Sequence, residues 1–295
     1  MRYYRIRNTK GIIRLCVEVP NGSLVDLTSL NDEVFDFRHL LSASYITGST
    51  VDTITSHILS NGGGDIYNLE DLIQSSKTSD SNLRIIRPLD PDEMWAAGPG
   101  NFEFPEDIVK NMPEQVRKVY ESNRPAMTYK GTSHRLVGPY DNIGIREDIE
   151  TTKAEGEMVL VIYKGNLVAF STGHEVSGGL MGESMWWAAA SKVFKGSSSL
   201  GPCIVTPETI SDPSNLHIEC IINRNGKEFE KSTNVTKFKR TPEEIVARTV
   251  EHDTPPDLVI LYSGGIVAGG PMLGGDVVRI SLEDVGYVEN TVEIV

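Results

Sequence analysis

Residues 151–177, TTKAEGEMVLVIYKGNLVAFSTGHEVS, are the stretch that most constrains how this chain folds. Two apolar runs flank a turn at 164–166, a pattern that predicts an antiparallel β-hairpin. Because side chains alternate between the two faces of a strand, Glu155 and Glu157 project from the same face. Glu175 lies at the same open end of the hairpin, on the second strand. The sequence therefore gathers carboxylates at one end of a hairpin.

Two registers of this hairpin are compatible with the sequence, and they aim Glu175 differently. A three-residue turn pairs Tyr163 with Leu167. Glu155 then lies opposite Glu175, and all three carboxylates share one face. A two-residue turn instead places His174 opposite Glu155 and moves Glu175 to the other face. The glycine in the turn permits either geometry, so both registers stay open.

Carboxylates gathered in a packed site need a compensating charge. Two like charges about 4 Å apart repel by roughly 4 kcal/mol at an effective dielectric of about 20. Ligation by carboxylates alone suits a hard ion such as Mg²⁺, Mn²⁺ or Ca²⁺, whereas zinc usually recruits Cys or His. We therefore expect Glu155, Glu157 and Glu175 to hold one divalent cation. The alternative is that Glu155 and Glu157 are solvated residues at the end of an ordinary edge strand.

Composition and charge exclude several classes of protein. The chain has 295 residues, of which 39% are hydrophobic and 23% charged, so it can bury a core. Its formal net charge of −13 opposes contact with nucleic acid or with anionic lipid. The first residues lack the apolar core of a signal peptide, and no apolar run approaches the ~20 residues of a membrane helix. We expect a cytoplasmic protein that binds neither nucleic acid nor membrane.

The order of periodic segments predicts two domains. Strand-like runs fill residues 1–30, and helical periodicity follows from 32 to 76. The segment RPLDPDEMW, rich in proline and carboxylates, suits a connection between domains. We therefore predict an α+β protein with a small N-terminal α/β domain over residues 1–88 and a larger β-rich domain over residues 89–295. A capped helix is expected at TPEEIVARTV, with Thr241 as the N-cap.

Five motifs follow one another along the chain: EGE, HEVS, SKVFKGSSSLGPCIV, NGKEFEKSTNVTKF and YSGGIVAGGPMLGGDVVRI. Their kind and order resemble those of the fumarylacetoacetate hydrolase superfamily. The chain most resembles the 2-keto-3-deoxy-D-arabinonate dehydratase group, to which RPLDPDEMWAAG and VRKVYESNRPAMTYKGTSHRLVG are also similar. The resemblance runs from about Leu83 to Ile280.

This resemblance implies a mixed β-sandwich roll and a Mg²⁺ site. Its ligands would be Glu155, Glu157 and Glu175, with glutamate in place of the aspartate usual at the last position. It also implies that Lys192, in ASKVF, points into the site. A small 2-oxo acid as substrate and a homodimer or homotetramer are implied as well.

The chemistry of a 2-oxo acid suggests roles for two further residues. A metal chelated by the carboxylate and the 2-oxo group stabilises an enolate. Lys192 is our candidate for the base or the substrate-orienting group, because desolvation and nearby cations lower a lysine pKa. The alternative is a solvated lysine beside Lys195. Glu103, in NFEF, aligns with a lid acid of the family across a one-residue gap and is the candidate acid, with a surface carboxylate as the alternative.

Two more residues are candidates for substrate binding. Lys130, in TYKGT, matches a lysine of the group and is expected to pair with a substrate carboxylate, with a structural ion pair as the alternative. His174 is expected to support the metal site as a neighbour or proton carrier. Its alternative is packing on the opposite face of the strand.

The predicted reaction is metal-dependent dehydration of a 2-keto-3-deoxy sugar acid. The chain has no histidine between His57 and His134, where hydrolytic members carry a lid His-Glu pair, and this favours dehydration. Hydrolysis or decarboxylation of an acylpyruvate-like or oxaloacetate-like compound is the alternative on the same fold. Family members read DVSARD where this chain reads EVSGGLMGE, and Val235 replaces a threonine. These departures keep a non-catalytic 2-oxo acid binder open.

Overall fold

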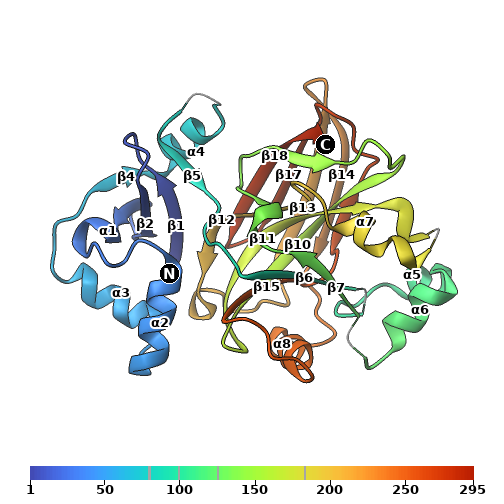
Figure 1. Ribbon diagram of the computed structural model, residues 1–295, viewed down its shortest axis with the longest axis horizontal. Helices are drawn as coiled ribbons and strands as arrows, with labels where there is room; N and C mark the ends of the chain where they lie inside the picture. The colour runs from blue at the N-terminus through green and yellow to red at the C-terminus, as the bar shows by residue number, and fades with distance from the viewer. Residues whose placement is uncertain (79–80, 99, 125, 183) are drawn as a thin grey trace.

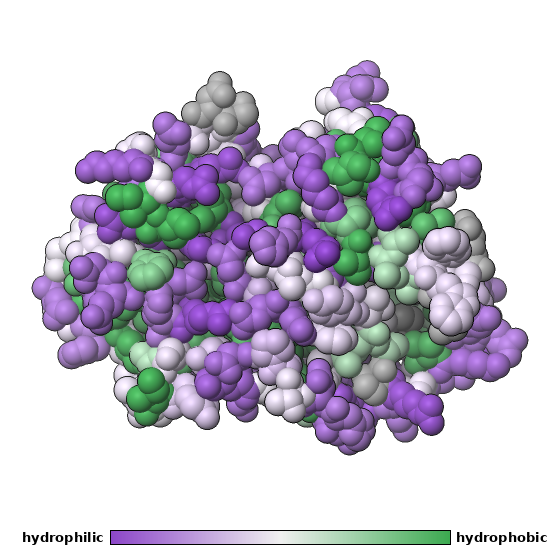
Figure 2. Space-filling view, in the orientation of Figure 1, coloured by the Kyte–Doolittle hydropathy of each residue, from purple (hydrophilic) through white to green (hydrophobic). Residues whose placement is uncertain are grey.

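The computed structural model describes residues 1–78, 81–98, 100–124, 126–182 and 184–295. Within these ranges the strands form two β-sheets, one of 13 strands and one of five. Figure 1 shows the N-terminal part at one end of the long axis and the rest of the chain at the other. Hydrophilic side chains cover most of the face in view, with hydrophobic residues in separate patches (Figure 2). Within the described ranges, no helix combines the length and the apolar character needed to cross a membrane.

Residues 1–88, called the N-terminal module below, combine short strands and helices. The helical periodicity predicted over 32–76 is confirmed by three helices, and the Thr50 side chain accepts a hydrogen bond from the Thr53 backbone N–H, as an N-cap does. The module contains β1 (Arg2–Arg7), β2 (Ile13–Glu18), β3 (Ser23–Asp26), α1 (Leu27–Leu30), α2 (Phe37–Thr47), α3 (Val51–Leu59), β4 (Ile66–Asn68), α4 (Leu69–Ser76) and β5 (Arg84–Ile86).

Residues 89–295, called the body, are dominated by strands. The predicted capped helix is present, with a reciprocal capping box between Thr241 and Glu244. The body contains β6 (Glu93–Ala97), α5 (Glu106–Asn111), α6 (Glu114–Glu121), β7 (Met127–Gly131), η1 (Ser133–Arg135), β8 (Leu136–Val137), β9 (Ile143–Ile145), β10 (Thr152–Tyr163), β11 (Asn166–Gly178), η2 (Gly179–Gly182), η3 (Met185–Trp187), α7 (Ala188–Lys192), β12 (Ser198–Val205), η4 (Pro207–Thr209), β13 (His217–Arg224), β14 (Lys227–Val235), α8 (Pro242–Val250), β15 (Leu258–Tyr262), β16 (Val267–Gly269), β17 (Val277–Leu282) and β18 (Gly286–Ile294), where η marks a 3₁₀ helix.

The larger sheet runs through both parts of the molecule, in the order β4-β3-β2-β1-β12-β11-β10-β15-β6-β7. Strand β1 of the module pairs with β12 of the body, and Tyr3 lies opposite Ile204. Both residues belong to one buried core that spans the module and the body. The predicted boundary after residue 88 falls between β5 and β6, and it stays a prediction.

The second sheet has the order β14-β13-β17-β18-β9 and packs against the larger one. Strands β10 and β11 contact β13, β17 and β18, and helix α8 also packs on β10 and β11 (Figure 1). The central hairpin is therefore enclosed between a second sheet and a helix. This arrangement confirms the predicted α+β class with a β-rich body.

The turn of the central hairpin is the two-residue alternative. Tyr163 pairs with Asn166, which leaves Lys164 and Gly165 as the turn. Their φ angles are 47° and 78°, and a type I′ hairpin turn requires positive φ at both positions.

The pairing at the open end is nevertheless that of the three-residue alternative. A β-bulge shifts the register between Val161 and Ile162, because Val168 is an extra residue on β11. Beyond the bulge, Glu155 lies opposite Glu175. The bulge thus returns all three carboxylates to one face of the hairpin.

Candidate metal centre and active site

Glu155, Glu157 and Glu175 form a compact carboxylate cluster. Each offers one carboxylate oxygen, and these oxygens lie within 4.8 Å of one another. Glu157 and Glu175 are buried, whereas the Glu155 side chain keeps 24% of its surface exposed. The cluster is therefore closed toward the core and open to solvent at Glu155.

Lys192 closes one side of the cluster. It is the last residue of α7, and its Nζ lies 2.7 Å from Oε2 of Glu175 and 3.5 Å from Oε2 of Glu155. The side chain is 11% exposed, so the ammonium group lies at the edge of the cluster. The structure thus brings the predicted Lys192 together with two of the predicted ligands.

Lys130 reaches the cluster from the interior. Its Nζ lies 2.9 Å from Oε1 of Glu175 and donates hydrogen bonds of 3.3 Å to the carbonyl groups of Val176 and Ser197. The side chain has no exposed surface. The observed contact is therefore the structural ion pair that the sequence analysis held as the alternative to a substrate contact.

Glu157 is held by a backbone group that sequence reasoning did not single out. The N–H of Gly264, between β15 and β16, donates a 2.7 Å hydrogen bond to Oε2 of Glu157. Gly264 has φ +116°, and a Cβ there would lie 3.2 Å from the carbonyl oxygen of Gly98. Glycine is favoured here by backbone conformation and by close packing. The only signal in the sequence was the glycine-rich run itself.

When ionised, the cluster holds more negative charge than its lysines offset. Burial raises the pKa of the Glu155 carboxyl to about 7. Burial, with the charges of Glu175 and Glu155, raises the pKa of Glu157 well above its usual range. Burial would also raise the pKa of Glu175, but Lys130 and Lys192 outweigh it and hold that pKa below the usual range. When all three carboxylates are ionised, as metal ligation requires, they exceed the two ammonium groups by one negative charge.

The pKa of Lys192 is raised, whereas the sequence analysis expected it to be lowered. Burial alone would lower the pKa, but the carboxylates of Glu175 and Glu155 outweigh it and raise the pKa above its ordinary value. The sequence argument considered neighbouring cations, whereas the nearest charges in the fold are anions. An ammonium that keeps its proton suits an orienting role better than that of a base.

His174 lies on the opposite face of β11 from Glu175 and packs among buried residues. Its Nδ1 is 3.3 Å from Oδ1 of Asn290, whose Nδ2 donates to the carbonyl groups of Gly138 and Asp141. Because the amide oxygen can only accept, Nδ1 of His174 carries the proton. Burial lowers the pKa of His174 to about 4. The histidine is thus a neutral packed residue, the alternative that the sequence analysis had left open.

Glu103 lies outside the cluster. It is exposed, and its backbone N–H donates a 2.7 Å hydrogen bond to the carbonyl of Lys237. Across the described ranges, its side chain forms no hydrogen bond or ion pair. The adjoining Phe102 approaches Gly264, so the segment lies beside the residue that holds Glu157. The role of Glu103 as an acid stays a prediction.

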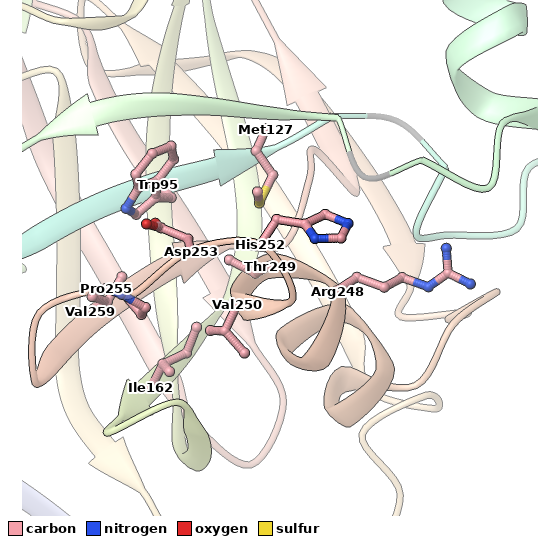
Figure 3. Close-up of a pocket in the computed structure, with 10 residues that line it drawn as sticks. All are labelled: Trp95, Met127, Ile162, Arg248, Thr249, Val250, His252, Asp253, Pro255 and Val259. Carbon is pink, nitrogen blue, oxygen red and sulfur yellow. The ribbon is translucent and has the colours of Figure 1, made fainter.

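A cavity of about 270 Å³ lies away from the cluster, toward the turn end of β10. Figure 3 shows Trp95 and Met127 of the sheet near Thr249 and Val250 at the end of α8. None of the residues that line it belongs to the carboxylate cluster. Its volume is below the ~300–1,000 Å³ of most ligand pockets. We therefore assign the chemistry to the cluster and not to this cavity.

The donor set of the cluster fits a hard divalent cation. All three donors are carboxylate oxygens, they converge, and one negative charge lacks a partner when all three are ionised. Mg²⁺, Mn²⁺ and Ca²⁺ prefer oxygen ligands of this kind. The position of Glu155 leaves an approach from solvent for a further ligand.

Comparison with known proteins gives related sequences and folds. The profile named Fumarylacetoacetate (FAA) hydrolase C-terminal matches residues 169–293. The probable 2-keto-3-deoxyxylonate dehydratase of Haloferax volcanii is 30% identical over 283 residues, covering 93% of this chain and 94% of the relative. The 2-dehydro-3-deoxy-D-arabinonate dehydratase of Saccharolobus solfataricus is 31% identical over 230 residues, covering 74% and 76%.

A solved structure extends the likeness to the fold. The hexagonal crystal form of 2-keto-3-deoxyarabinonate dehydratase superposes with a TM-score of 0.83 at 25% identity, covering 100% of this chain and 99% of the other. The sequence likeness over nearly the whole length of the Haloferax relative agrees with this shared fold. The chain belongs to the fumarylacetoacetate hydrolase family.

Proposed function

We propose that this protein is a metal-dependent hydro-lyase that removes water from a 2-keto-3-deoxy sugar acid. The convergence of Glu155, Glu157 and Glu175 is the observation that carries the proposal. The names of the two relatives, both sugar acid dehydratases, support the reaction and the class of substrate. The substrate is then a small 2-oxo acid, and we propose a cytoplasmic homodimer or homotetramer.

The cofactor in this proposal is one divalent cation held by Glu155, Glu157 and Glu175. Mg²⁺ is the first choice, with Mn²⁺ and Ca²⁺ as alternatives. A 2-keto-3-deoxy-D-arabinonate dehydratase of the same fold, with a TM-score of 0.79, has been solved with magnesium and 2,5-dioxopentanoate. When bound, such an ion would supply a Lewis acid that polarises the 2-oxo group.

The residues of this chain divide the remaining tasks. In the net reaction the proton of C3 and the hydroxyl of C4 leave as one water, which forms a C3–C4 double bond. A proton shift from C5 to C3 then moves the double bond to C4–C5, and the resulting enol tautomerises to the aldehyde at C5. We assign to Lys192 the orientation of the substrate, because its ammonium group lies at the solvent edge of the cluster. Glu103 is our candidate for the acid that protonates the leaving hydroxyl, since its segment lies beside Gly264. Lys130 and His174 support the site from behind, out of reach of solvent.

A direct assay tests the proposal. Purified protein with Mg²⁺ and a 2-keto-3-deoxypentonate should release a semialdehyde without cleaving a carbon–carbon bond. EDTA should abolish the activity, and added Mg²⁺ should restore it. Release of pyruvate from an acylpyruvate, or of carbon dioxide from oxaloacetate, would favour the hydrolase or decarboxylase alternative. Saturable binding of 2-oxo acids without turnover would identify a non-catalytic binder.

A further inference from the structure

Lys130 is a lysine with no exposed surface, which is a rare environment for an ammonium group. All of its polar contacts are internal: a carboxylate oxygen of Glu175 at 2.9 Å, and the carbonyl groups of Val176 and Ser197 at 3.3 Å. A buried charge persists where it is paired and hydrogen-bonded. The surroundings of Lys130 meet both conditions without any ligand.

The position of Lys130 connects three segments around one carboxylate. Lys130 belongs to β7, Glu175 and Val176 to β11, and Ser197 directly precedes β12. The other oxygen of Glu175 meets Lys192, 2.7 Å away. Both oxygens of Glu175 are thus held by ammonium groups, one inside the fold and one at the solvent edge. The direction of this carboxylate is determined by the protein itself.

We propose that Lys130 is a built-in counter-charge that keeps Glu175 directed at Glu155 and Glu157 when no cation is bound. The carboxylate cluster is then preformed, and the fold does not depend on the metal. Lys130 is a positioning residue in this view, because it acts through Glu175 and does not touch the substrate. The inference rests on the metal site of the proposed function.

Replacing Lys130 by methionine tests this role. The variant retains the length of the side chain but leaves Glu175 as a buried carboxylate without its inner partner. In EDTA we expect its melting temperature to fall by roughly 10 °C, as for other uncompensated buried charges. Saturating Mn²⁺ should recover much of this loss, so the stabilisation by Mn²⁺ becomes larger than in the wild type. A purely structural lysine would give equal losses in EDTA and in Mn²⁺, and that result would overturn the proposal.

Two further variants make the test specific. Lys195→Met removes an exposed lysine, 75% accessible and paired with Glu293, and should behave as the wild type in both conditions. Lys130→Met combined with Glu175→Met removes both charges. It should regain stability in EDTA while losing the response to Mn²⁺. If Lys130→Met does not fold in either condition, recovery of folding in the double variant supports the proposal and continued unfolding refutes it.

The melting experiment needs no substrate, so it separates this inference from the proposed reaction. A wild type without dehydratase activity, together with an enlarged Mn²⁺ response in Lys130→Met, would refute the reaction and support the counter-charge. An active wild type with an unchanged Mn²⁺ response in Lys130→Met would support the reaction and refute the counter-charge. If Mn²⁺ does not shift the melting of the wild type, the counter-charge proposal fails together with the metal site.

Discussion

The three carboxylates of the cluster differ mainly in what compensates each charge. Each oxygen of Glu175 contacts an ammonium group, and Glu157 accepts a hydrogen bond from one backbone N–H. Glu155 is partly exposed to solvent and lies 3.5 Å from Nζ of Lys192. These partners agree with the pKa shifts. The two ammonium groups lower the pKa of Glu175, whereas burial raises the pKa values of Glu155 and Glu157. Glu157 is buried, and its partner is a backbone N–H and not an ammonium group, so its carboxylate should gain most from a bound cation.

Replacing Glu157 by glutamine tests this relation. Glutamine retains the shape and can still accept the hydrogen bond from Gly264, but it removes a buried negative charge. We expect the Mn²⁺ dissociation constant to rise at least about tenfold, since even indirect contacts to metal ligands are worth 10–100-fold. The melting temperature in EDTA should not fall, because an undercompensated charge has been removed. Isothermal titration calorimetry measures the first quantity and differential scanning calorimetry the second.

Glu293→Gln is the matched control for this substitution. Glu293 pairs with the exposed Lys195 and is not one of the clustered carboxylates, so its loss should leave Mn²⁺ binding unchanged. Equal Mn²⁺ affinity in Glu157→Gln and the wild type would show that Glu157 is not a ligand.

His174 makes a pH-dependent contribution to stability whose sign is determined by burial. Its pKa falls from 6.5 to about 4 on folding, so between these values the unfolded chain binds a proton that the folded chain does not. Above pH 6.5 the histidine is neutral in both states and contributes no pH dependence. As the pH falls from 6.5 to 4, folding should lose about 3 kcal/mol, at about 1.4 kcal/mol per pKa unit.

The variant His174→Asn separates this contribution from other acid effects. Asparagine can present an N–H to Asn290 in place of Nδ1 and does not titrate. In urea unfolding at pH 7, 5.5 and 4.5, the wild type should lose stability more steeply than the variant. His252→Asn, which changes an 89% exposed histidine, should follow the wild type. Parallel curves for the wild type and His174→Asn would contradict the buried, neutral state.

At the scale of the elements, short sequence patterns predicted the ends of helices, but the geometry of the site depends on contacts between residues that are distant in the sequence. The helix cap at Thr241 could be predicted because a cap depends on only a few neighbouring residues. The direction of the Glu175 side chain could not be predicted, because it depends on the β-bulge at Val168 and no residue type in the sequence marks that bulge. The pKa of Lys192 depends on carboxylates distant in the sequence, and the carboxylates reach it only in the folded chain.

The hairpin that carries the cluster requires glycine at position 173, because neighbouring side chains leave no room for a Cβ. This glycine pairs with Glu157, and a Cβ there would lie 2.5 Å from Cγ2 of Val159 and 2.6 Å from the ring of Tyr262. The ring cannot easily move, because its hydroxyl donates a 2.8 Å hydrogen bond to the carbonyl of Ser199. Gly173→Ala should therefore reduce the free energy of unfolding by about 1–3 kcal/mol, the usual effect of overpacking.

Urea unfolding checks this value against a second glycine. At Gly274 the nearest atoms to an added Cβ belong to the flexible Ile294 side chain, at 3.2 Å, so Gly274→Ala should cost much less. Because Gly173 faces Glu157, its replacement should also weaken Mn²⁺ binding, whereas Gly274→Ala should not. Equal stability of the two variants would refute the packing argument.

For the whole molecule, the larger sheet makes the N-terminal module and the body interdependent. Strand β1 covers the edge of β12, and the core that contains Tyr3 and Ile204 spans both parts. Strand β12 also pairs with β11, which carries Glu175, so the module supports the hairpin of the site through one intervening strand. A chain can thus have two domains by composition and still share one sheet between them.

Expressing residues 89–295 alone tests this interdependence. Removal of β1 exposes the edge of β12 and the buried side chains of Cys203 and Ile204. Because an exposed apolar edge strand pairs with other chains, we expect this fragment to aggregate or to melt well below the full chain. Size-exclusion chromatography with light scattering and a thermal melt provide the two measurements. Co-expression with residues 1–88 should restore a soluble complex, because the missing strand is supplied in trans. A fragment that is monodisperse and melts like the full chain would show that the body folds independently, with β1 only an addition to its edge.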